Sequence, residues 1–430
     1  MTSEAPIPES FLRALHQSGH AGVIAVTGGG ASALGQLLSV PGGSNSILAG
    51  VIPYSEPALV DWLGVRPEQF CSPETALAMA VRAFEQARGY KPDPSSQLFG
   101  LACTASLASD RPKKGDHRFY LAAQTPNRTI LRSLVLDKGT RTRAQEESVV
   151  AHALLNLFAE FAGVPERCDP LLHASEIIHA EESVPDPLLA EVWNGRRNFV
   201  WVNPQSEFLT DAKPPVGALL CGSFNPLHDA HRELRQVAEN VLGVQVGYEL
   251  SIANVAKPSL DYLTIQHRIG QFSPAYAVLT RAAHFYQKAT LFPGLWFVVG
   301  MDTAERIVDP RFYDGNPELM HERLTEIKRI GCRVLVAGRL KQDRFETRAD
   351  LHVPPEFDDL FVELPASKFR RDLSSTELRV RCQTHLERSP LTPAPTPAGS
   401  LPKAGCTSET AIHPPSPPAI ASPHPPPAPP

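Results

Sequence analysis

The chain has 430 residues, of which 42% are hydrophobic and 20% charged, and its formal net charge is -5. This composition is typical of a globular protein with two or three domains, and the charge gives no sign of general nucleic-acid or membrane binding. The seven cysteines show no C-x-x-C spacing, and no apolar run approaches the roughly 20 residues of a membrane helix, which argues against a disulfide framework, a cysteine zinc site and a membrane span. The first residues, MTSEAPIPES, lack the features of a signal peptide, so we expect a cytoplasmic protein.

The first part of the chain alternates apolar runs with segments of helical periodicity. Strands are predicted at 21–27, 97–103, 118–124 and 130–136. Helices are predicted at 31–39, 73–88 and 145–162. The first strand ends at three glycines, Gly28 to Gly30, which indicates a tight turn into a helix that can still bind a phosphate. We therefore expect an α/β domain over residues 1–163.

Residues 164–215 contain several prolines and are harder to assign. A short helix is predicted near 187–193 and a strand at NFVWVN, 198–203. We interpret this stretch as a connecting subdomain.

A second alternation starts at Val216. Strands are predicted at 217–221, 244–252, 295–300, 332–338 and 360–364. Helices are predicted at 230–243, about 264–289 and 317–331. Such an alternation favours a doubly wound parallel sheet, with ligands beyond the carboxyl ends of the strands. We assign this domain to residues 216–388. Residues 389–430 are rich in proline and are predicted to be a disordered or polyproline-like tail.

The stretch GSFNPLHDAHR, from Gly222 to Arg232, follows the first strand of the second domain. Backbone N–H groups of Gly222 and Ser223 at a strand end can face an anion. His228 and His231 stand about one helical turn apart near a predicted helix N-terminus, where phosphate is favoured. A His pair at this spacing also occurs as a surface or metal-binding pair. The pattern nevertheless favours a polyphosphate site, and it contains no P-loop lysine.

This stretch resembles the Gly-Ser/Gly-Phe-x-Pro-x-His-x-Gly-His signature of the nucleotidylyltransferase superfamily, with Ala230 in place of the last glycine. A second stretch, LSSTELR at 373–379, resembles the family block Ile-Ser-Ser-Thr-x-x-Arg. The resemblance covers about 216–381 and implies a Rossmann-like fold. It also implies that His228, His231 and Arg379 are catalytic. The nucleotide-binding residues that it implies are Gly222, Ser223, Phe224, Ser374, Ser375 and Thr376.

Two further segments are similar to one branch, the nicotinamide/nicotinate mononucleotide adenylyltransferases. They are AKPSLDYLTIQHRI, with Lys257 and Arg268, and VVGMDTAERI, with Gly300 and Asp302. The resemblance implies that Lys257 acts with the histidines and Arg379, that Gly300 and Asp302 contact the nucleotide, and that Mg²⁺ accompanies ATP. Arg268 is equally compatible with a simple carboxylate pair, and Asp302 with a helix cap.

The implied activity is transfer of AMP from ATP to a pyridine mononucleotide, with release of pyrophosphate. Two alternatives stay open, namely a cytidylyltransferase or other nucleotidylyltransferase and a non-catalytic nucleotide-binding protein. The expected partners are small nucleotides rather than nucleic acids or membranes.

Residues 39–65 of the first domain look like part of the nicotinamide-nucleotide amidase family, the C-terminal domain of competence-damage-inducible proteins. In that family a serine nucleophile is activated by a lysine. The alignment places Thr27 at the nucleophile and Leu59 at the lysine, with Gly28, Gly29 and Gly30 in the adjoining turn. A threonine without a nearby base is a poor nucleophile. We therefore expect a degenerate amidase site, kept for mononucleotide binding or for assembly of a homo-oligomer.

Overall fold

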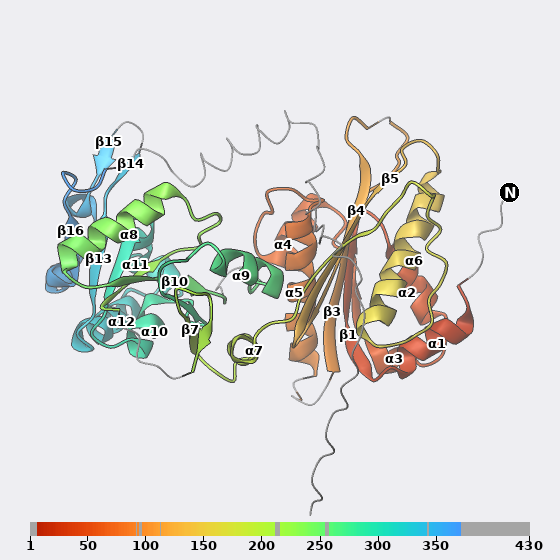
Figure 1. Cartoon of the computed structure of the whole chain (residues 1–430), viewed down its shortest axis with the longest axis horizontal. Helices are drawn as coiled ribbons and strands as arrows, with labels where there is room; N and C mark the ends of the chain where they lie inside the picture. Colours follow the sequence, from red (N-terminus) through yellow and green to blue (C-terminus); the bar gives the residue numbers. More distant parts are fainter. Residues whose placement is uncertain are drawn as a thin grey trace, which may run out of the picture. The chain divides into compact units, whose positions relative to one another are not determined.

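The computed structural model describes residues 7–91, 93, 97–111, 113–210, 216–253, 258–341 and 344–370 (Figure 1). These described residues fall in one compact unit, which is α/β and contains two large sheets. The tail predicted at 389–430 lies outside the described residues.

The first sheet has six strands in the order β2-β1-β3-β4-β5-β6. Its strands are β1 (His20–Thr27), β2 (Ile47–Val51), β3 (Gln97–Ser106), β4 (His117–Thr125), β5 (Arg128–Leu136) and β6 (His179–Ser183). Strand β1 is parallel to β2 and β3, whereas β4, β5 and β6 follow β3 in antiparallel pairs. The strands predicted in this part of the chain are thus present, and the sheet is mixed.

Helices cover both faces of the first sheet (Figure 1). They are α1 (Glu9–Gln17), α2 (Ala31–Leu38), α3 (Gly43–Ser46), α4 (Glu56–Leu63), α5 (Pro73–Tyr90) and α6 (Arg143–Phe161). Helices α1, α2 and α6 share one apolar core with the sheet, and α4 and α5 share the other. The long helices start at good caps, because the Ser72 side chain accepts from the Thr75 N–H, and Thr142 forms a capping box with Gln145.

The second sheet has eight strands in the order β16-β13-β12-β9-β10-β11-β7-β8. Its strands are β7 (Phe199–Val202), β8 (Phe208–Leu209), β9 (Ala218–Cys221), β10 (Val246–Ser251), β11 (Ala277–Thr280), β12 (Trp296–Gly300), β13 (Arg333–Ala337) and β16 (Phe361–Leu364). The six strands from β16 to β11 are parallel, and β7 and β8 extend the sheet in antiparallel fashion. The chain order reverses between β9 and β12, so a crevice is expected beyond the carboxyl ends of these two strands.

Both faces of the second sheet also carry helices. They are α7 (Pro187–Trp193), α8 (Asp229–Leu242), α9 (Tyr262–Ile269), α10 (Phe285–Leu291), α11 (Met301–Ile307) and α12 (Pro317–Arg329). The first three pack on one face and the last three on the other. A small hairpin, β14 (Arg339–Lys341) with β15 (Arg344–Glu346), follows β13, and 3₁₀ turns lie at Pro310–Phe312, Arg348–Asp350 and Pro355–Leu360.

The single helix predicted over about 264–289 is wrong. Helix α9 ends at Ile269, the central strand β11 occupies Ala277–Thr280, and α10 begins only at Phe285. Gly270 and Pro274 interrupt the helix, and the four residues of β11 are fully buried. A short apolar run that is buried on both sides has the same hydrophobic pattern as a buried helix, which explains the error.

Residues 164–210, the described part of the connecting subdomain predicted at 164–215, contribute to both sheets. β6 pairs with β5 at the edge of the first sheet, and β7 pairs with β11 of the second. Between them, α7 places Trp193 against Phe84 of α5 and Tyr262 of α9, with ring centroids 5.1 and 5.2 Å apart. These three aromatic residues belong to one buried cluster that joins the two α/β halves.

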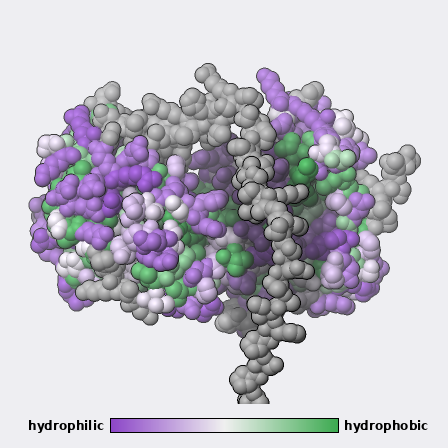
Figure 2. Space-filling model, in the orientation of Figure 1, coloured by the Kyte–Doolittle hydropathy of each residue, from purple (hydrophilic) through white to green (hydrophobic). Residues whose placement is uncertain are grey.

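On the face shown in Figure 2, hydrophilic residues are widespread and hydrophobic ones lie between them. The most exposed large apolar side chains include Ile177 and Val184, each 70% exposed. Such isolated apolar side chains are normal on protein surfaces. None of the helices in the described ranges combines the length and apolar character needed to cross a bilayer.

Candidate functional site

The turn after β9 is fixed by its own residues. Gly222 donates its backbone N–H to the Glu249 carbonyl at 3.2 Å, and a Cβ at Gly222 would lie 2.9 Å from the ring of Phe224. Phe224 has a φ of 46°, a left-handed conformation that is unusual for a bulky residue. Arg268 stabilises this turn, because its Nη1 donates to the Ser223 carbonyl at 2.8 Å. The turn is thus held from two sides, and Ser223 is exposed at the carboxyl edge of the sheet.

The two predicted histidines lie together at the start of α8. His228 is the N-cap residue and His231 lies in the first turn. Their rings are stacked, with centroids 3.7 Å apart and an interplanar angle of 25°. The structure therefore brings both imidazoles to the same end of α8, where the helix dipole and free N–H groups favour an anion.

The environment of His231 fixes its charge and its tautomer. Burial lowers the pKa of His231 to about 4, with a smaller contribution from His228, so the ring is neutral near pH 7. Its Nδ1 lies 3.4 Å from the backbone N–H of His228, a long hydrogen bond in which Nδ1 accepts. The proton then resides on Nε2, which leaves an N–H donor available to a ligand. Burial also lowers the pKa of His228.

Phe224, predicted to contact the nucleotide, is 1% exposed and supports His231 instead. Its ring meets the His231 ring edge to face at 5.2 Å, and it also contacts Tyr248 and Phe272 at 5.2 and 5.3 Å. These contacts make Phe224 a positioning residue for the imidazole.

Gly300 and Asp302 lie at the end of β12, the strand next to β9. Gly300 is the N-cap residue of α11, and a Cβ there would meet no atom within 4 Å, so its surface is open. Asp302 is exposed in the first turn of α11, and its carboxylate forms an ion pair with Arg339. The structure thus places both predicted nucleotide contacts beside the turn after β9, with Asp302 already paired.

The substituted position Ala230 adopts an ordinary helical conformation. It is the second residue of α8, and the described non-glycine residues with positive φ are Leu171, Ser206, Phe224 and Asp314. The glycine expected at this position is therefore not needed for backbone freedom.

Five predicted residues lie outside the described residues and stay predictions: Lys257, Ser374, Ser375, Thr376 and Arg379.

A buried ion pair under the candidate site was missed by sequence reasoning. Glu249 of β10 is fully buried, and its carboxylate accepts from Lys288 Nζ at 2.5 Å and from Thr280 Oγ1 at 2.6 Å. The backbone carbonyl of Glu249 accepts the hydrogen bond from the Gly222 N–H. A charged residue inside a predicted apolar strand, in the segment VGYELS, was the one available signal.

In the first half, the predicted Thr27–Gly30 segment joins β1 to α2. Gly30 is the left-handed N-cap residue of α2, with a φ of 86°. The Glu147 carboxylate accepts from the N–H groups of Gly30 and Ser32, at 2.8 and 3.0 Å, and Arg143 Nη2 donates to the Gly28 carbonyl at 2.6 Å. A phosphate from solution would have to displace this internal carboxylate.

Two cavities, of about 440 and 250 Å³, share Thr27, Gly28, Tyr54 and Arg143 as lining residues. The smaller one also contacts Leu59, Cys71 and Lys113. Leu59 is 2% exposed and supplies no proton acceptor. Burial raises the pKa of the Cys71 thiol despite the nearby Arg118, so this cysteine is protonated at neutral pH.

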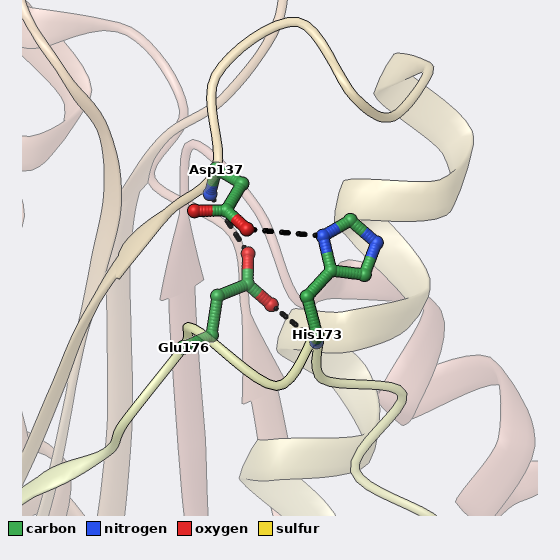
Figure 3. Close-up of side chains that lie close together, drawn as sticks. All are labelled: Asp137, His173 and Glu176. Carbon is green, nitrogen blue, oxygen red and sulfur yellow. Dashed lines mark hydrogen bonds and ion pairs between the residues drawn. The ribbon is translucent and has the colours of Figure 1, made fainter.

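One potential ligand atom from each of Asp137, His173 and Glu176 lies within 4.8 Å of the other two, a spacing at which the three side chains could hold a metal ion (Figure 3). Hydrogen bonds already occupy several of these atoms, including both carboxylate oxygens of Glu176. His173 Nδ1 lies 3.2 Å from Asp137 Oδ2, and Glu176 accepts from Arg141 at 2.5 and 2.7 Å and from the backbone N–H groups of Asp137 and His173. Although burial opposes it, the hydrogen bonds from Arg141 and the two backbone N–H groups lower the pKa of Glu176 to about 2. A cation would compete with Arg141, so we interpret the cluster as structural.

Comparison with known proteins places the first half in context. Residues 7–161 match the family model of the CinA C-terminal domain. A search of curated proteins found no match. The domain that bears Thr27 and Glu147 is therefore similar to the CinA C-terminal domain, in agreement with the first-half resemblance.

Several solved structures are similar to a little over a third of this chain. The competence/damage inducible protein CihA from Agrobacterium tumefaciens is 19% identical, with a TM-score of 0.30, over 38% of this chain and 100% of that chain. A competence or damage-inducible protein from Enterobacter asburiae is 17% identical, with a TM-score of 0.29, over 36% and 96% of the two chains.

Proposed function

We propose that the second half of the chain is a nucleotidylyltransferase with a Rossmann-like fold that transfers AMP from ATP to nicotinamide or nicotinate mononucleotide. The observation that carries this proposal is the stacked pair of His228 and His231 at the N-terminus of α8, beside the reversal of strand order between β9 and β12. The parallel strands have the 3-2-1-4-5-6 order of doubly wound nucleotide-binding sheets, counted from β9.

The reaction requires positioning and charge stabilisation rather than a covalent intermediate. A phosphate oxygen of the acceptor attacks the α-phosphorus of ATP, the bond from that phosphorus to the bridging oxygen breaks, and pyrophosphate leaves. The Nε2–H of His231 donates to an oxygen of the transferring phosphate as its negative charge grows. Gly222 and Ser223 line the same edge, where Arg268 keeps their turn in place.

Mg²⁺ would be held chiefly by the triphosphate and water. Asp302, the carboxylate at the end of β12, is already paired with Arg339, so the described part of this edge offers a weak protein site for the ion. An edge with a single, already paired carboxylate fits a metal ion that binds together with its nucleotide. Mg²⁺ would there neutralise part of the polyphosphate charge.

For the first half we propose a binding domain without hydrolytic activity, which takes a pyridine mononucleotide or serves assembly of a homo-oligomer. Thr27 lies at the cavity, but Leu59 fills the position where a base is needed and is buried.

The decisive experiment mixes the full-length protein with Mg²⁺, ATP and nicotinamide mononucleotide and follows pyrophosphate and NAD. Both products should form, and His231→Ala should lower turnover by about 10² to 10⁴-fold with an unchanged circular dichroism spectrum. Reaction of CTP with a sugar or alcohol phosphate would favour a cytidylyltransferase. Nucleotide binding without pyrophosphate from any acceptor would favour a non-catalytic protein.

A further inference from the structure

A pocket of about 300 Å³ lies beside the turn that precedes His228. Val65, Glu74 and Ala78 of the first half form one side of it. The second half supplies Asn225 and Arg268, among others. The pocket is therefore composite, since neither half of the chain encloses it alone.

Several contacts hold the two sides of this pocket together. The backbone N–H and hydroxyl of Ser259 donate to Glu85 of α5, at 3.1 and 2.7 Å. The Tyr262 hydroxyl donates to the Pro126 carbonyl at 2.7 Å, and its backbone N–H donates to Thr129 Oγ1 at 3.1 Å. Because Tyr262 is fully buried, these bonds are shielded from water, and the pocket has a defined geometry.

The polar groups on the two sides are chemically complementary to a sugar phosphate. Arg268 contributes its guanidinium to the lining, where Nε is buried and Nη1 donates to the Ser223 carbonyl, so that Nη2 is the nitrogen that can donate to a phosphate. Glu74 is exposed in the first turn of α5, and within the described ranges its carboxylate takes part in no ion pair. A carboxylate accepts hydrogen bonds from ribose hydroxyls, and a guanidinium binds phosphate. The volume is at the lower end for ligand sites, which suits part of a nucleotide rather than a dinucleotide.

We propose that this pocket binds the ribose phosphate of the acceptor mononucleotide and that Glu74, from the first half, recognises its ribose hydroxyls. The inference rests on the proposed transferase function of the second half. It gives the first half a direct part in acceptor selection, distinct from the cavities around Thr27.

The test is Glu74→Gln in the full-length protein, assayed with ATP and nicotinamide mononucleotide. We expect the KM for the mononucleotide to rise roughly tenfold, with kcat and the KM for ATP nearly unchanged, because a charged hydrogen bond to the bound acceptor is lost. The matched control is Glu9→Gln, the same change in the first turn of α1, where Glu9 pairs with Arg13 on the surface. This control should leave all three constants unchanged.

A second variant blocks the pocket by volume. Val65 is 39% exposed, so Val65→Trp can fill the pocket without disturbing the core. It should also raise the KM for the mononucleotide selectively. An unchanged mononucleotide KM in both variants would overturn the inference and leave the transferase function intact.

If the wild-type protein shows no transfer, the proposed transferase function is wrong. The ribose phosphate pocket is then tested separately, by a binding measurement. Calorimetry with ribose 5-phosphate would compare the wild type with Glu74→Gln. Weaker binding to the variant supports the ribose phosphate pocket, whereas equal binding, or none to either protein, refutes it.

Discussion

The Glu147 carboxylate accepts a hydrogen bond of 2.8 Å from the backbone N–H of Gly30, 117 positions earlier in the chain. It thereby occupies the N-terminus of α2, where a phosphate would otherwise be favoured. The chain supplies its own anion to this helix, and the turn at Gly28–Gly30 is stabilised without any ligand.

This contact predicts a loss of stability on substitution. Glu147→Ala removes the acceptor of two backbone N–H groups, so we expect the free energy of unfolding to fall by about 1–3 kcal/mol. Glu147→Gln should cost less, because its amide oxygen can still accept. Urea unfolding of both variants measures the difference. The exposed Glu322→Ala is the control, and an equal effect of all three substitutions would contradict the role of Glu147.

The buried ion pair of Lys288 and Glu249 predicts that the effects of substituting the two residues on stability are strongly coupled. Lys288→Met leaves a buried carboxylate without its cation, at a cost of about 3–5 kcal/mol. The double variant Lys288→Met with Glu249→Gln should be more stable than Lys288→Met alone, because no uncompensated charge remains. A double-mutant cycle by urea unfolding measures this coupling, and simple additivity of the two effects would disprove it.

The lowered pKa of His231 predicts that the protein loses stability in mild acid. Its folded pKa of about 4 lies below the usual 6.5, so the unfolded chain binds the proton more tightly. The contribution of His231 to stability is therefore complete above about pH 6.5 and is lost as the pH falls towards 4, at about 1.4 kcal/mol per pKa unit. Denaturant unfolding at pH 7 and 4.5 should show a smaller acid loss for His231→Gln than for the wild type. The exposed His179→Gln should behave like the wild type.

Alanine substitution at two glycines of the candidate site should change stability to different extents. In Gly222→Ala the new methyl group would meet the Phe224 ring at 2.9 Å. We therefore expect the free energy of unfolding to fall by about 1–3 kcal/mol and the Phe224 ring to move away from His231. In Gly300→Ala the methyl group meets no atom within 4 Å, so stability should change by less than about 0.5 kcal/mol. Thermal unfolding compares the two, and equal melting temperatures would refute the predicted contact with Phe224.

Local signals in the sequence were sufficient for most elements and for the position of the histidine pair. The apolar run before Gly222 is β9, and Gly243 ends α8 in the left-handed conformation that favours glycine. The strand β11 was missed, because four buried residues carry no periodicity that separates strand from helix.

The hydrogen bonds that hold the turns of the two sites in place could not be predicted, because they join residues that are far apart in the sequence. Arg268 reaches the Ser223 carbonyl across 45 positions, and Glu147 reaches Gly30 across 117. No spacing rule connects such residues. The predicted roles of Lys257 and Arg379 concern residues outside the described ranges and stay predictions.

Strand β6 belongs to the first sheet and β7 to the second, so any truncation of the chain near this point affects both halves. A cut after residue 163 would strip the first sheet of its edge strand, and a cut after Ser183 would still bare the aromatic surface shared by Phe84, Trp193 and Tyr262. Either half expressed alone would therefore expose apolar side chains that the full chain buries, and each truncated protein should be more prone to aggregate than the full chain.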